Sequence, residues 1–361
     1  MRLESLTFID AELPLGNDLQ MKLIAKHVAT QLRPNWNSNK ISFETFTAGI
    51  TNKVFCVIHK SNEGSSKEER MIFRVYGKNT DKIIDREAEL KNWLRLAAVG
   101  CAAPLYGTFN NGLVCGYLPG KSLKVEALRD SDIYPRICKA MSRIHRIRPN
   151  APEMPSFYKQ TEKFIKNFST KFSNEDMQRR FDIFAANCNV SLINDYSKLK
   201  ELISVMNSDI VFCHNDLLVH NIVYCENTGK LTFIDYEYAD FNYRCFDIAN
   251  HFNEYAGVED VDYSLCPTDD EKRQWIEKYL EYYLRRKPLA DEVDKMLQQI
   301  PLFEAASHFL WAVWALVQSQ ISTIDFDYLG FVYQFFYQFE ILTLGCFTTG
   351  NITFLAVFYI S

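Results

Sequence analysis

The sequence predicts an α/β (α+β) fold in which a sheet-forming N-terminal part is followed by a mostly helical C-terminal part. Short apolar runs bounded by turn residues, typical of antiparallel strands, lie at residues 41–47, 53–59, 71–76, 105–109 and 113–117. Helical spacing of apolar residues dominates further on, as over residues 132–148. We expect an N-terminal lobe over residues 1–116, a C-terminal lobe over residues 117–340 and an uncharged tail over residues 341–361.

Composition limits the class of protein. A net charge of −5 over 361 residues argues against a protein that binds nucleic acid. The 10 cysteines are scattered without a C-x-x-C pair, which is typical of reduced cysteines in a cytosolic protein. The N-terminal stretch MRLESLTFIDAELP carries charges where a secretory signal needs an apolar run. We therefore expect a cytoplasmic protein.

The most informative stretch, residues 211–240, reads as strand, polar loop, strand, turn and strand. Polar side chains stand at the strand ends: Asp216, Asn221 and Asp235. Asp216 precedes Asn221 by five positions and is followed by leucine, which is the spacing of the protein-kinase catalytic loop H-R-D-L-x-x-x-N. Asn215 replaces the arginine of that pattern. Asp235 follows on the next strand, where the kinase D-F-G aspartate would lie.

The chemistry of phosphoryl transfer explains why these residue types recur at this spacing. A carboxylate must accept the proton of an attacking hydroxyl, and hard oxygen ligands must hold Mg²⁺ on the phosphates of ATP. Asp216 suits the first role, and Asn221 with Asp235 suits the second. Asp and Asn also make ordinary turns and caps. Order, spacing and flanking strands together favour the phosphotransfer interpretation and a bilobed protein-kinase-like fold.

The stretch resembles the choline/ethanolamine kinase family, through HNDLLVHNI, IDYEY and FNYRCFDIANHFNEYAG. The resemblance covers residues 43–328 and fits the ethanolamine kinase subgroup best, through HFNEYAGVEDVDYSLCP and STIDFDYL. It implies an ATP- and Mg²⁺-dependent kinase that converts ethanolamine to phosphoethanolamine, the first step of the CDP-ethanolamine route to phosphatidylethanolamine. Choline kinase and small-molecule kinases of the aminoglycoside type are the nearest alternatives. An inactive regulatory or membrane-attached binding protein is the alternative from another class.

The resemblance also assigns residues to the nucleotide. FTAGITNKVF is similar to the family's phosphate-loop segment, which implies phosphate contact by Thr51 and Asn52, although a plain hairpin turn fits these residues equally well. Arg74 stands on a strand where protein kinases place a phosphate-binding lysine, and a guanidinium grips phosphate oxygens in a bidentate fork. We expect Glu87 on the following helix to be the partner of Arg74, with Glu89 as the alternative.

Further residues are expected to support the catalytic loop and to hold the amine. Asp247 and His214 are predicted to support the loop that carries Asp216, while His251 fits an ordinary buried histidine. In the family, an acid, its neighbour and two tryptophans line the amine pocket. The matching residues here are Glu254, Tyr255, Trp311 and Trp314. Trp311 and Trp314 lie three apart on one predicted helix, a spacing that also fits plain core packing.

Two regions carry no predicted site. Residues 157–206 are charged and amphipathic and are predicted to form helices without a chemical motif. Residues 341–360 contain no charged side chain. They fit a membrane anchor, a buried terminal segment or an alternative transcript end without special function, and we favour the last. The predicted partners are therefore an amino alcohol and ATP, with no nucleic acid; membrane contact through the tail and a homodimer both stay open.

Overall fold

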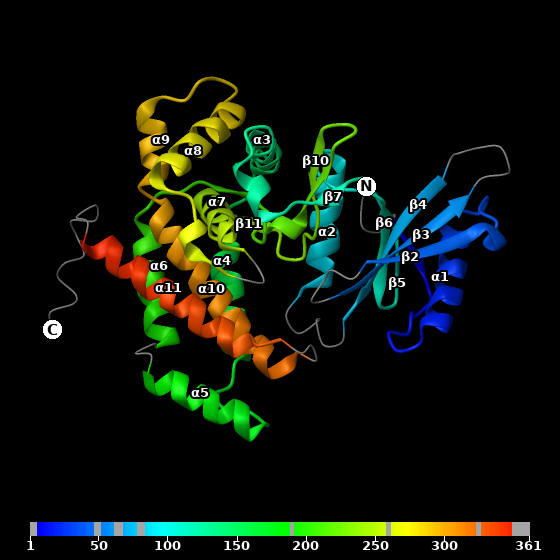
Figure 1. The fold of residues 1–361 in the computed structure, drawn as a ribbon, viewed down its shortest axis with the longest axis horizontal. Helices are drawn as coiled ribbons and strands as arrows, with labels where there is room; N and C mark the ends of the chain where they lie inside the picture. The colour runs from blue at the N-terminus through cyan, green and yellow to red at the C-terminus, as the bar shows by residue number, and fades with distance from the viewer. Residues whose placement is uncertain are drawn as a thin grey trace. The chain divides into compact units, whose positions relative to one another are not determined.

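The computed structural model describes residues 6–46, 52–60, 68–77, 84–187, 191–257, 261–322 and 326–348. The chain divides into two compact units, coloured by residue number in Figure 1. Unit 1 consists of Met1–Lys121 and Val223–Glu237, and unit 2 consists of Ser122–Ile222 and Tyr238–Ser361. The predicted order, a sheet first and helices afterwards, is confirmed.

Unit 1 is built on a six-stranded sheet with the order β1-β5-β6-β4-β3-β2. Its strands are β1 (Thr7–Ile9), β2 (Ile41–Phe46), β3 (Asn52–Lys60), β4 (Glu68–Tyr76), β5 (Leu105–Phe109) and β6 (Gly112–Gly116). Only the β1–β5 pair is parallel, and the other neighbours are antiparallel. Antiparallel neighbours are typical of hairpins, and hairpin signals in the sequence located β2 to β6. The parallel strand β1 was not predicted.

One helix covers the sheet of unit 1 and builds its core. Helix α1 (Asp18–Leu32) begins at Asn17, whose side chain accepts a hydrogen bond from the Gln20 backbone N–H. Its buried face, which includes Met21 and Val28, joins one apolar cluster with alternate strand residues such as Phe55. Burial of this face, at about 25 cal/mol per Å² of apolar surface, stabilises the sheet that carries Arg74.

Unit 1 also contains a hairpin that comes much later in the chain. Strands β9 (Ile222–Cys225) and β10 (Lys230–Phe233) pair next to the short strand β7 (Lys121–Ser122). Tyr236, directly after the hairpin, is buried and donates hydrogen bonds to the carbonyls of Cys101 and Phe233. A cut after residue 116 in chain order leaves this hairpin with the C-terminal lobe, whereas packing of Tyr236 joins it to unit 1.

Unit 2 is mainly helical. Its helices are α3 (Tyr134–His145), α4 (Ser156–Asn167), α5 (Glu175–Asn187), α6 (Leu192–Ser204), α7 (Arg244–Asn253), α8 (Asp269–Leu284), α9 (Ala290–Leu297), α10 (Ile300–Ile321) and α11 (Tyr328–Thr348). The predicted helical stretch over residues 157–206 thus forms α4, α5 and α6. Strands β8 (Ile210–Cys213) and β11 (Asp240–Tyr243) pair antiparallel beside them.

Helix α10 is the central element of unit 2 and packs against α4, α6, α7, α9 and α11. Among the described residues, the helical stretch Ala290–Ile321 alone is long and apolar enough to cross a bilayer, and 89% of its most apolar window is buried inside the protein. A helix that is apolar on all sides is expected at the centre of a helical domain. Its apolar character is therefore accounted for by core packing.

The last described helix, α11, passes through the predicted boundary between residues 340 and 341 without a break. Phe336 and Phe339 on this helix pack against Phe309 of α10. Residues 349–361, which hold most of the predicted tail, lie outside the described part of the chain. The three interpretations of the tail stay predictions.

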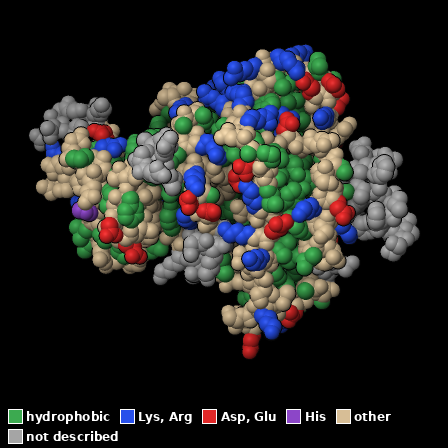
Figure 2. All heavy atoms as spheres, turned by 180° about the vertical axis from the view of Figure 1, so that it is seen from behind, with side chains coloured by type: hydrophobic (Ala, Val, Ile, Leu, Met, Phe, Trp, Pro, Cys, Tyr) green, Lys and Arg blue, Asp and Glu red, His purple; other side chains and the backbone are tan. Residues whose placement is uncertain are grey.

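Basic residues are distributed unevenly on unit 2, and Figure 2 shows Lys and Arg side chains gathered along the top of that view. Residues 134–148, around α3, contain five Lys or Arg and no Asp or Glu. Further exposed cations, Arg285, Arg286 and Lys287, follow the end of α8. Positive charge at the carboxyl end of a helix is favourable because it opposes the negative end of the helix dipole.

Candidate active site

The loop between β8 and β9 carries Asp216 and Asn221, both in unit 2. Asp216 is half-buried, and Asn221 is buried at the end of a 3₁₀ turn. The Asn221 side-chain amide donates to the backbone carbonyl of Asp216 at 2.8 Å and to its carboxylate at 3.4 Å. The loop thus brings together the carboxylate and the amide that the sequence predicted as base and metal ligand.

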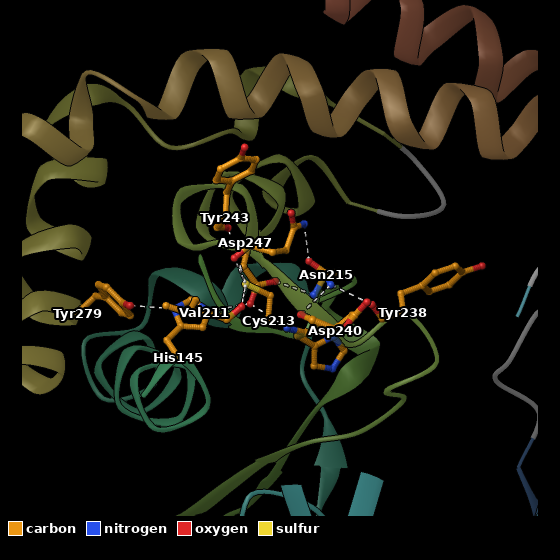
Figure 3. Close-up of polar contacts among 11 residues, drawn as sticks. His145, Val211, Cys213, Asn215, Tyr238, Asp240, Tyr243, Asp247 and Tyr279 are labelled. Atoms are coloured by element: carbon orange, nitrogen blue, oxygen red, sulfur yellow. Dashed lines mark hydrogen bonds and ion pairs between the residues drawn. The ribbon is translucent and has the colours of Figure 1, made fainter. Parts of the chain in front are cut away.

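Asp247 holds this loop from α7. Its carboxylate accepts the backbone N–H groups of His214 at 2.9 Å and Asn215 at 2.7 Å, and His145 contacts it at 2.9 Å (Figure 3). Burial alone would raise the pKa of Asp247, but the hydrogen bond and electrostatic interaction with His145, together with His214, outweigh it, so this pKa lies below its ordinary value. A buried, ionised carboxylate with several donors is the support that the sequence predicted for Asp247.

Asn215 is a second buried anchor of the loop, whereas the sequence pattern had marked it only as the residue that replaces an arginine. Its φ is +67°, a left-handed conformation that Asn tolerates better than most residues. The side-chain amide donates to the Tyr238 carbonyl at 2.9 Å and accepts from the Asn242 side chain at 2.8 Å (Figure 3). The backbone from which the neighbouring Asp216 side chain projects is therefore held in place by both hydrogen bonds of Asn215.

His251 supports the same loop from the next turn of α7. Its Nδ1 lies 2.9 Å from the Leu217 carbonyl, one residue beyond Asp216. Burial lowers the pKa of His251 to about 4, so the ring is neutral near pH 7 and Nδ1 carries the proton that it donates to this carbonyl. This outcome matches the interpretation of His251 as a buried histidine and adds a contact to the loop.

Arg74 lies at the centre of a buried ion-pair cluster in unit 1. Its guanidinium contacts Glu89 at 3.0 Å, Asp235 at 2.8 Å and Glu237 at 2.5 Å. Arg86 contacts Glu89 at 2.8 Å and Glu237 at 3.8 Å. Within the described part of the chain, two guanidinium groups thus face three carboxylates in this cluster.

The partner of Arg74 on α2 (Arg86–Ala98) is Glu89, and the prediction of Glu87 is wrong. The Glu89 side chain is fully buried, whereas that of Glu87 is 67% exposed and pairs with Lys91 at 2.5 Å. Successive helix residues are about 100° apart, so acids two positions apart point to nearly opposite sides. The side of α2 that packs inward contains position 89, and the sequence alone could not decide between the two acids.

Asp235 and Glu237 follow β10 in unit 1. Asp235 has a φ of +64°, a strained conformation for a non-glycine residue that is found mostly at functional sites. Burial, followed by the charge of Asp235, raises the pKa of Glu237 to about 7, against the opposing effect of Arg74. Glu237 was not predicted from the sequence; a second acid, two positions after Asp235 in the aromatic-rich run FIDYEY, was the available signal.

The structure describes the predicted phosphate-loop residues only in part. Thr51 lies outside the described residues, and β3 begins at Asn52, whose side chain also lies outside them. Their contact with phosphate stays a prediction. What the structure adds is the register of β3 against β4, which pairs Asn52 with Tyr76 and Val54 with Arg74. Strand β3, which follows the predicted phosphate loop in the sequence, is therefore the neighbour of the strand that carries Arg74.

Trp311 and Trp314 are part of an aromatic cluster in unit 2, together with Tyr238 and Tyr328. The two indole rings meet edge to face at 5.6 Å, Tyr238 meets Trp311 at 5.2 Å, and Tyr328 meets Trp314 at 5.9 Å. The Trp314 indole N–H donates to the Tyr238 hydroxyl at 2.8 Å. Edge-to-face packing is a stable arrangement for aromatic pairs, and it leaves ring faces at right angles to one another.

Glu254, the acid predicted to hold the amine, directly follows α7. Burial raises the pKa of Glu254 to about 7, and within the described residues no basic side chain forms an ion pair with it. Tyr255, the neighbouring prediction, is directed elsewhere: its hydroxyl donates to the Leu128 carbonyl at 3.1 Å and its ring packs on His251. Among the described ring contacts, none joins Tyr255 to the two tryptophans.

Comparison with known proteins agrees with this geometry. Residues 43–340 match the family described as choline/ethanolamine kinase. The chain belongs to the choline/ethanolamine kinase family. It is 39% identical to human ethanolamine kinase 1 over 318 residues, which is 85% of this chain and 69% of that protein. It is 34% identical to the probable ethanolamine kinase of Arabidopsis thaliana over 329 residues, or 90% of this chain and 86% of that one.

Solved structures of the family confirm the predicted fold. An ethanolamine kinase from Plasmodium vivax superposes with a TM-score of 0.75 at 25% identity, covering 91% of this chain and 89% of that one. A choline kinase from Cryptosporidium parvum gives a TM-score of 0.70 at 21% identity, covering 91% and 97%. Membership of this kinase family implies ATP as the co-substrate, a small alcohol as the acceptor and, typically, a divalent metal ion.

Proposed function

We propose that this protein is an ethanolamine kinase that transfers the γ-phosphoryl group of ATP to the hydroxyl of ethanolamine in the cytoplasm, with Mg²⁺ as its metal. The observation that carries the choice of amine is Glu254, a desolvated carboxylate without a basic partner among the described residues. A primary ammonium supplies both the missing charge and three hydrogen-bond donors. Human ethanolamine kinase 1 and the ethanolamine kinase from Plasmodium vivax carry the same activity in their names.

Asp216 is proposed as the catalytic base. It would orient the ethanolamine hydroxyl and take its proton as the oxygen attacks phosphorus, which is the role of the equivalent aspartate in the protein-kinase pattern. The loop around Asp216 is held by Asp247, Asn215 and His251 through backbone groups. A base held in one orientation is already aligned with the substrate hydroxyl for proton transfer, which favours a fast chemical step.

Asn221 and Asp235 are proposed as ligands of Mg²⁺, and Arg74 with its partner Glu89 as the nucleotide-positioning pair. Amide and carboxylate oxygens are the hard ligands that Mg²⁺ prefers. The surplus carboxylate around Arg74 fits this assignment, because Asp235 can exchange a guanidinium for a metal ion while Glu89 and Glu237 still neutralise Arg74. When bound, Mg²⁺ neutralises phosphate charge. Thr51 and Asn52, from the predicted phosphate loop that precedes β3 in the sequence, are proposed to contact the phosphates of ATP.

The preference for ethanolamine over choline depends on a balance between Glu254 and the aromatic cluster. A primary ammonium loses free energy if its donors stay unpaired after burial, so it needs a carboxylate. A quaternary ammonium has no donor and gains mainly from aromatic faces such as those of Trp311 and Trp314. The aromatic cluster therefore favours choline kinase as the second candidate, and Glu254 decides between them.

The test is kcat/KM for ethanolamine and choline with the purified protein and its Glu254→Gln variant. We expect the parent to prefer ethanolamine, and the variant to lose about 10-fold or more with ethanolamine because a charge-assisted hydrogen bond is removed. Choline use should change less. A parent that prefers choline, or a variant in which both amines lose equally, would contradict the ethanolamine assignment while leaving the kinase assignment standing.

The pH dependence gives a second reading of the same residue. The pKa of Glu254 lies near 7 in the free protein, and only the ionised form attracts ammonium. The kcat/KM for ethanolamine should therefore rise as pH increases through about 7. The Glu254→Gln variant should lack this rise, since glutamine does not titrate. Parallel pH profiles for parent and variant would mean that another group controls binding.

A further inference from the structure

Asn250 connects α7 to the aromatic cluster and has an unusual set of contacts. It is fully buried, one turn before Glu254. Its Oδ1 accepts two hydrogen bonds from α10, from the Trp311 indole N–H at 2.7 Å and from the Ser307 hydroxyl at 2.8 Å. Its Nδ2 is buried without a hydrogen-bond partner within the described residues. The amide is thus oriented entirely by what its oxygen accepts.

The two donors fix which way this amide points. An indole N–H can only donate, so rotating the amide by 180° would bring Nδ2 against the Trp311 N–H and break that bond. Burying an unpaired N–H is unfavourable; the fold nevertheless keeps this orientation. An apolar residue here would avoid the unpaired Nδ2 donor, but it would leave the buried Trp311 N–H without its acceptor. The arrangement therefore serves the two acceptor bonds.

The consequence is a fixed direction for the Trp311 ring. An indole with its N–H bonded cannot turn about its side-chain torsions without losing that bond. Trp314 is fixed in the same way, by the Tyr238 hydroxyl. Two indole rings fixed by separate hydrogen bonds meet at an interplanar angle of 81° and present faces in two directions.

We propose that Asn250 is a positioning residue that sets amine selectivity by fixing the face of Trp311, an inference that rests on the proposed function. N-methylated ammonium groups depend on aromatic faces, whereas a primary ammonium depends on a carboxylate. Freedom of the Trp311 ring therefore weakens choline more than ethanolamine. This effect is opposite in sign to that of Glu254→Gln, so the two residues control selectivity from opposite sides.

The central experiment is a double-mutant cycle on KM for ethanolamine, KM for ATP and the inhibition constant of choline as a competitor of ethanolamine. Asn250→Leu should raise the choline constant about 3- to 10-fold, the range expected for one lost neutral hydrogen bond. KM for ethanolamine and for ATP should change less than about twofold on the same reasoning, since neither ligand depends on this bond. In a Trp311→Phe background, which already lacks the indole N–H, Asn250→Leu should have no further effect.

The chain offers matched controls. Ser307→Ala removes the other hydrogen bond to the same oxygen and leaves the indole bond in place, so the choline constant should stay near the parent value. Asn250→Asp keeps the oxygen that Trp311 uses and should restore the parent constant. Full additivity of Asn250→Leu with Trp311→Phe, or an equal shift of all three constants, would overturn the inference. Trp311→Phe also removes the bond without touching Asn250, which covers the case of a poorly folded Asn250→Leu.

An activity-independent measurement separates this inference from the proposed function. With ¹⁵N-labelled tryptophan, the Trp311 indole signal, assigned by its loss in Trp311→Phe, should shift and exchange faster with water in Asn250→Leu but not in Ser307→Ala. An unmoved signal overturns the positioning role alone. A parent enzyme that uses no amino alcohol overturns the proposed function, and with it the selectivity role, even when the indole signal shifts as expected.

Discussion

Two buried polar regions, one in each unit, hold their key side chains by different means. In unit 2, the carboxylate of Asp247 accepts the backbone N–H groups of His214 and Asn215, and the loop is fixed by directional hydrogen bonds. In unit 1, Arg74 is surrounded by carboxylates, including Glu89 and Asp235, and is fixed by charge. Hydrogen bonds to backbone define one geometry, whereas ion pairs among several carboxylates allow partners to be exchanged.

The difference matches the tasks proposed for the two regions. A base must present one oxygen in one direction at the moment of proton transfer, so its loop gains from rigid support. A nucleotide and its metal ion arrive and leave in every turnover, so the residues that receive them must change partners without unfolding. Because several carboxylates surround Arg74, its guanidinium keeps an anionic partner whether or not Asp235 binds a metal ion. Changes in the supports of the Asp216 loop should therefore act on kcat, and changes around Arg74 on nucleotide and metal binding.

The largest effect is expected from Asp216→Asn. The variant keeps the shape of the side chain but cannot accept the hydroxyl proton, and loss of a general base lowers kcat by about 10²–10⁴-fold. ATP binding, measured by calorimetry, should stay close to the parent value. Near-normal turnover would rule out Asp216 as the base and would remove the reason for a rigid loop in unit 2.

Asp235→Ala should come next and should differ in kind. Removal of a hard anionic ligand weakens metal binding, so the Mg²⁺ concentration that gives half-maximal rate should rise by about 10-fold or more, as expected for one lost charged contact. Titrating Mg²⁺ against rate at saturating ATP measures it. A variant that saturates at the same Mg²⁺ concentration as the parent would exclude Asp235 as a ligand.

Asp247→Asn tests the support of the loop without touching the base. Asparagine at this position presents either an NH₂ group or a single oxygen to the N–H groups that donate to the carboxylate in the parent. Each buried donor left unpaired costs about 1–3 kcal/mol. We expect kcat to fall about 10- to 100-fold with KM values for both substrates little changed. Asp240→Asn is the matched control, because that half-buried carboxylate pairs with Lys159 and accepts no backbone N–H of His214 or Asn215 among the described hydrogen bonds. An equal loss in the control would show general destabilisation instead.

The smallest effect is expected in unit 1, where Glu89→Gln and Glu87→Gln form a pair. Glu89 is buried against Arg74, and loss of its charge should raise KM for ATP by about 10-fold, since a charged hydrogen bond is worth about 1.5–3 kcal/mol. Glu87 pairs with Lys91 at the surface, where such pairs contribute little. Glu87→Gln should therefore behave as the parent. The reverse result would restore Glu87 as the partner of Arg74 in the working enzyme.

The sequence by itself determined the features that depend on local spacing. Asp216 and Asn221 lie in one short loop, and five residues of chain bring their side chains together whatever surrounds them. Hairpin signals located β2 to β6 of unit 1, and the spacing of Trp311 and Trp314 placed both on one helix. Support of the loop by Asp247 was also expected from the sequence.

Only the tertiary structure decided which of several similar residues faces inward. Glu87 and Glu89 have the same chemistry, and the packing of α2, set by contacts distant in sequence, buries one of them. Asn250 gave no signal, because its partners lie on α10, 57 and 61 positions away. Glu237 likewise belongs to the Arg74 cluster only because the hairpin that contains β10 packs in unit 1, which the sequence did not indicate. Local spacing fixes distances along the chain, whereas the direction of a side chain is set by the surface against which its element packs.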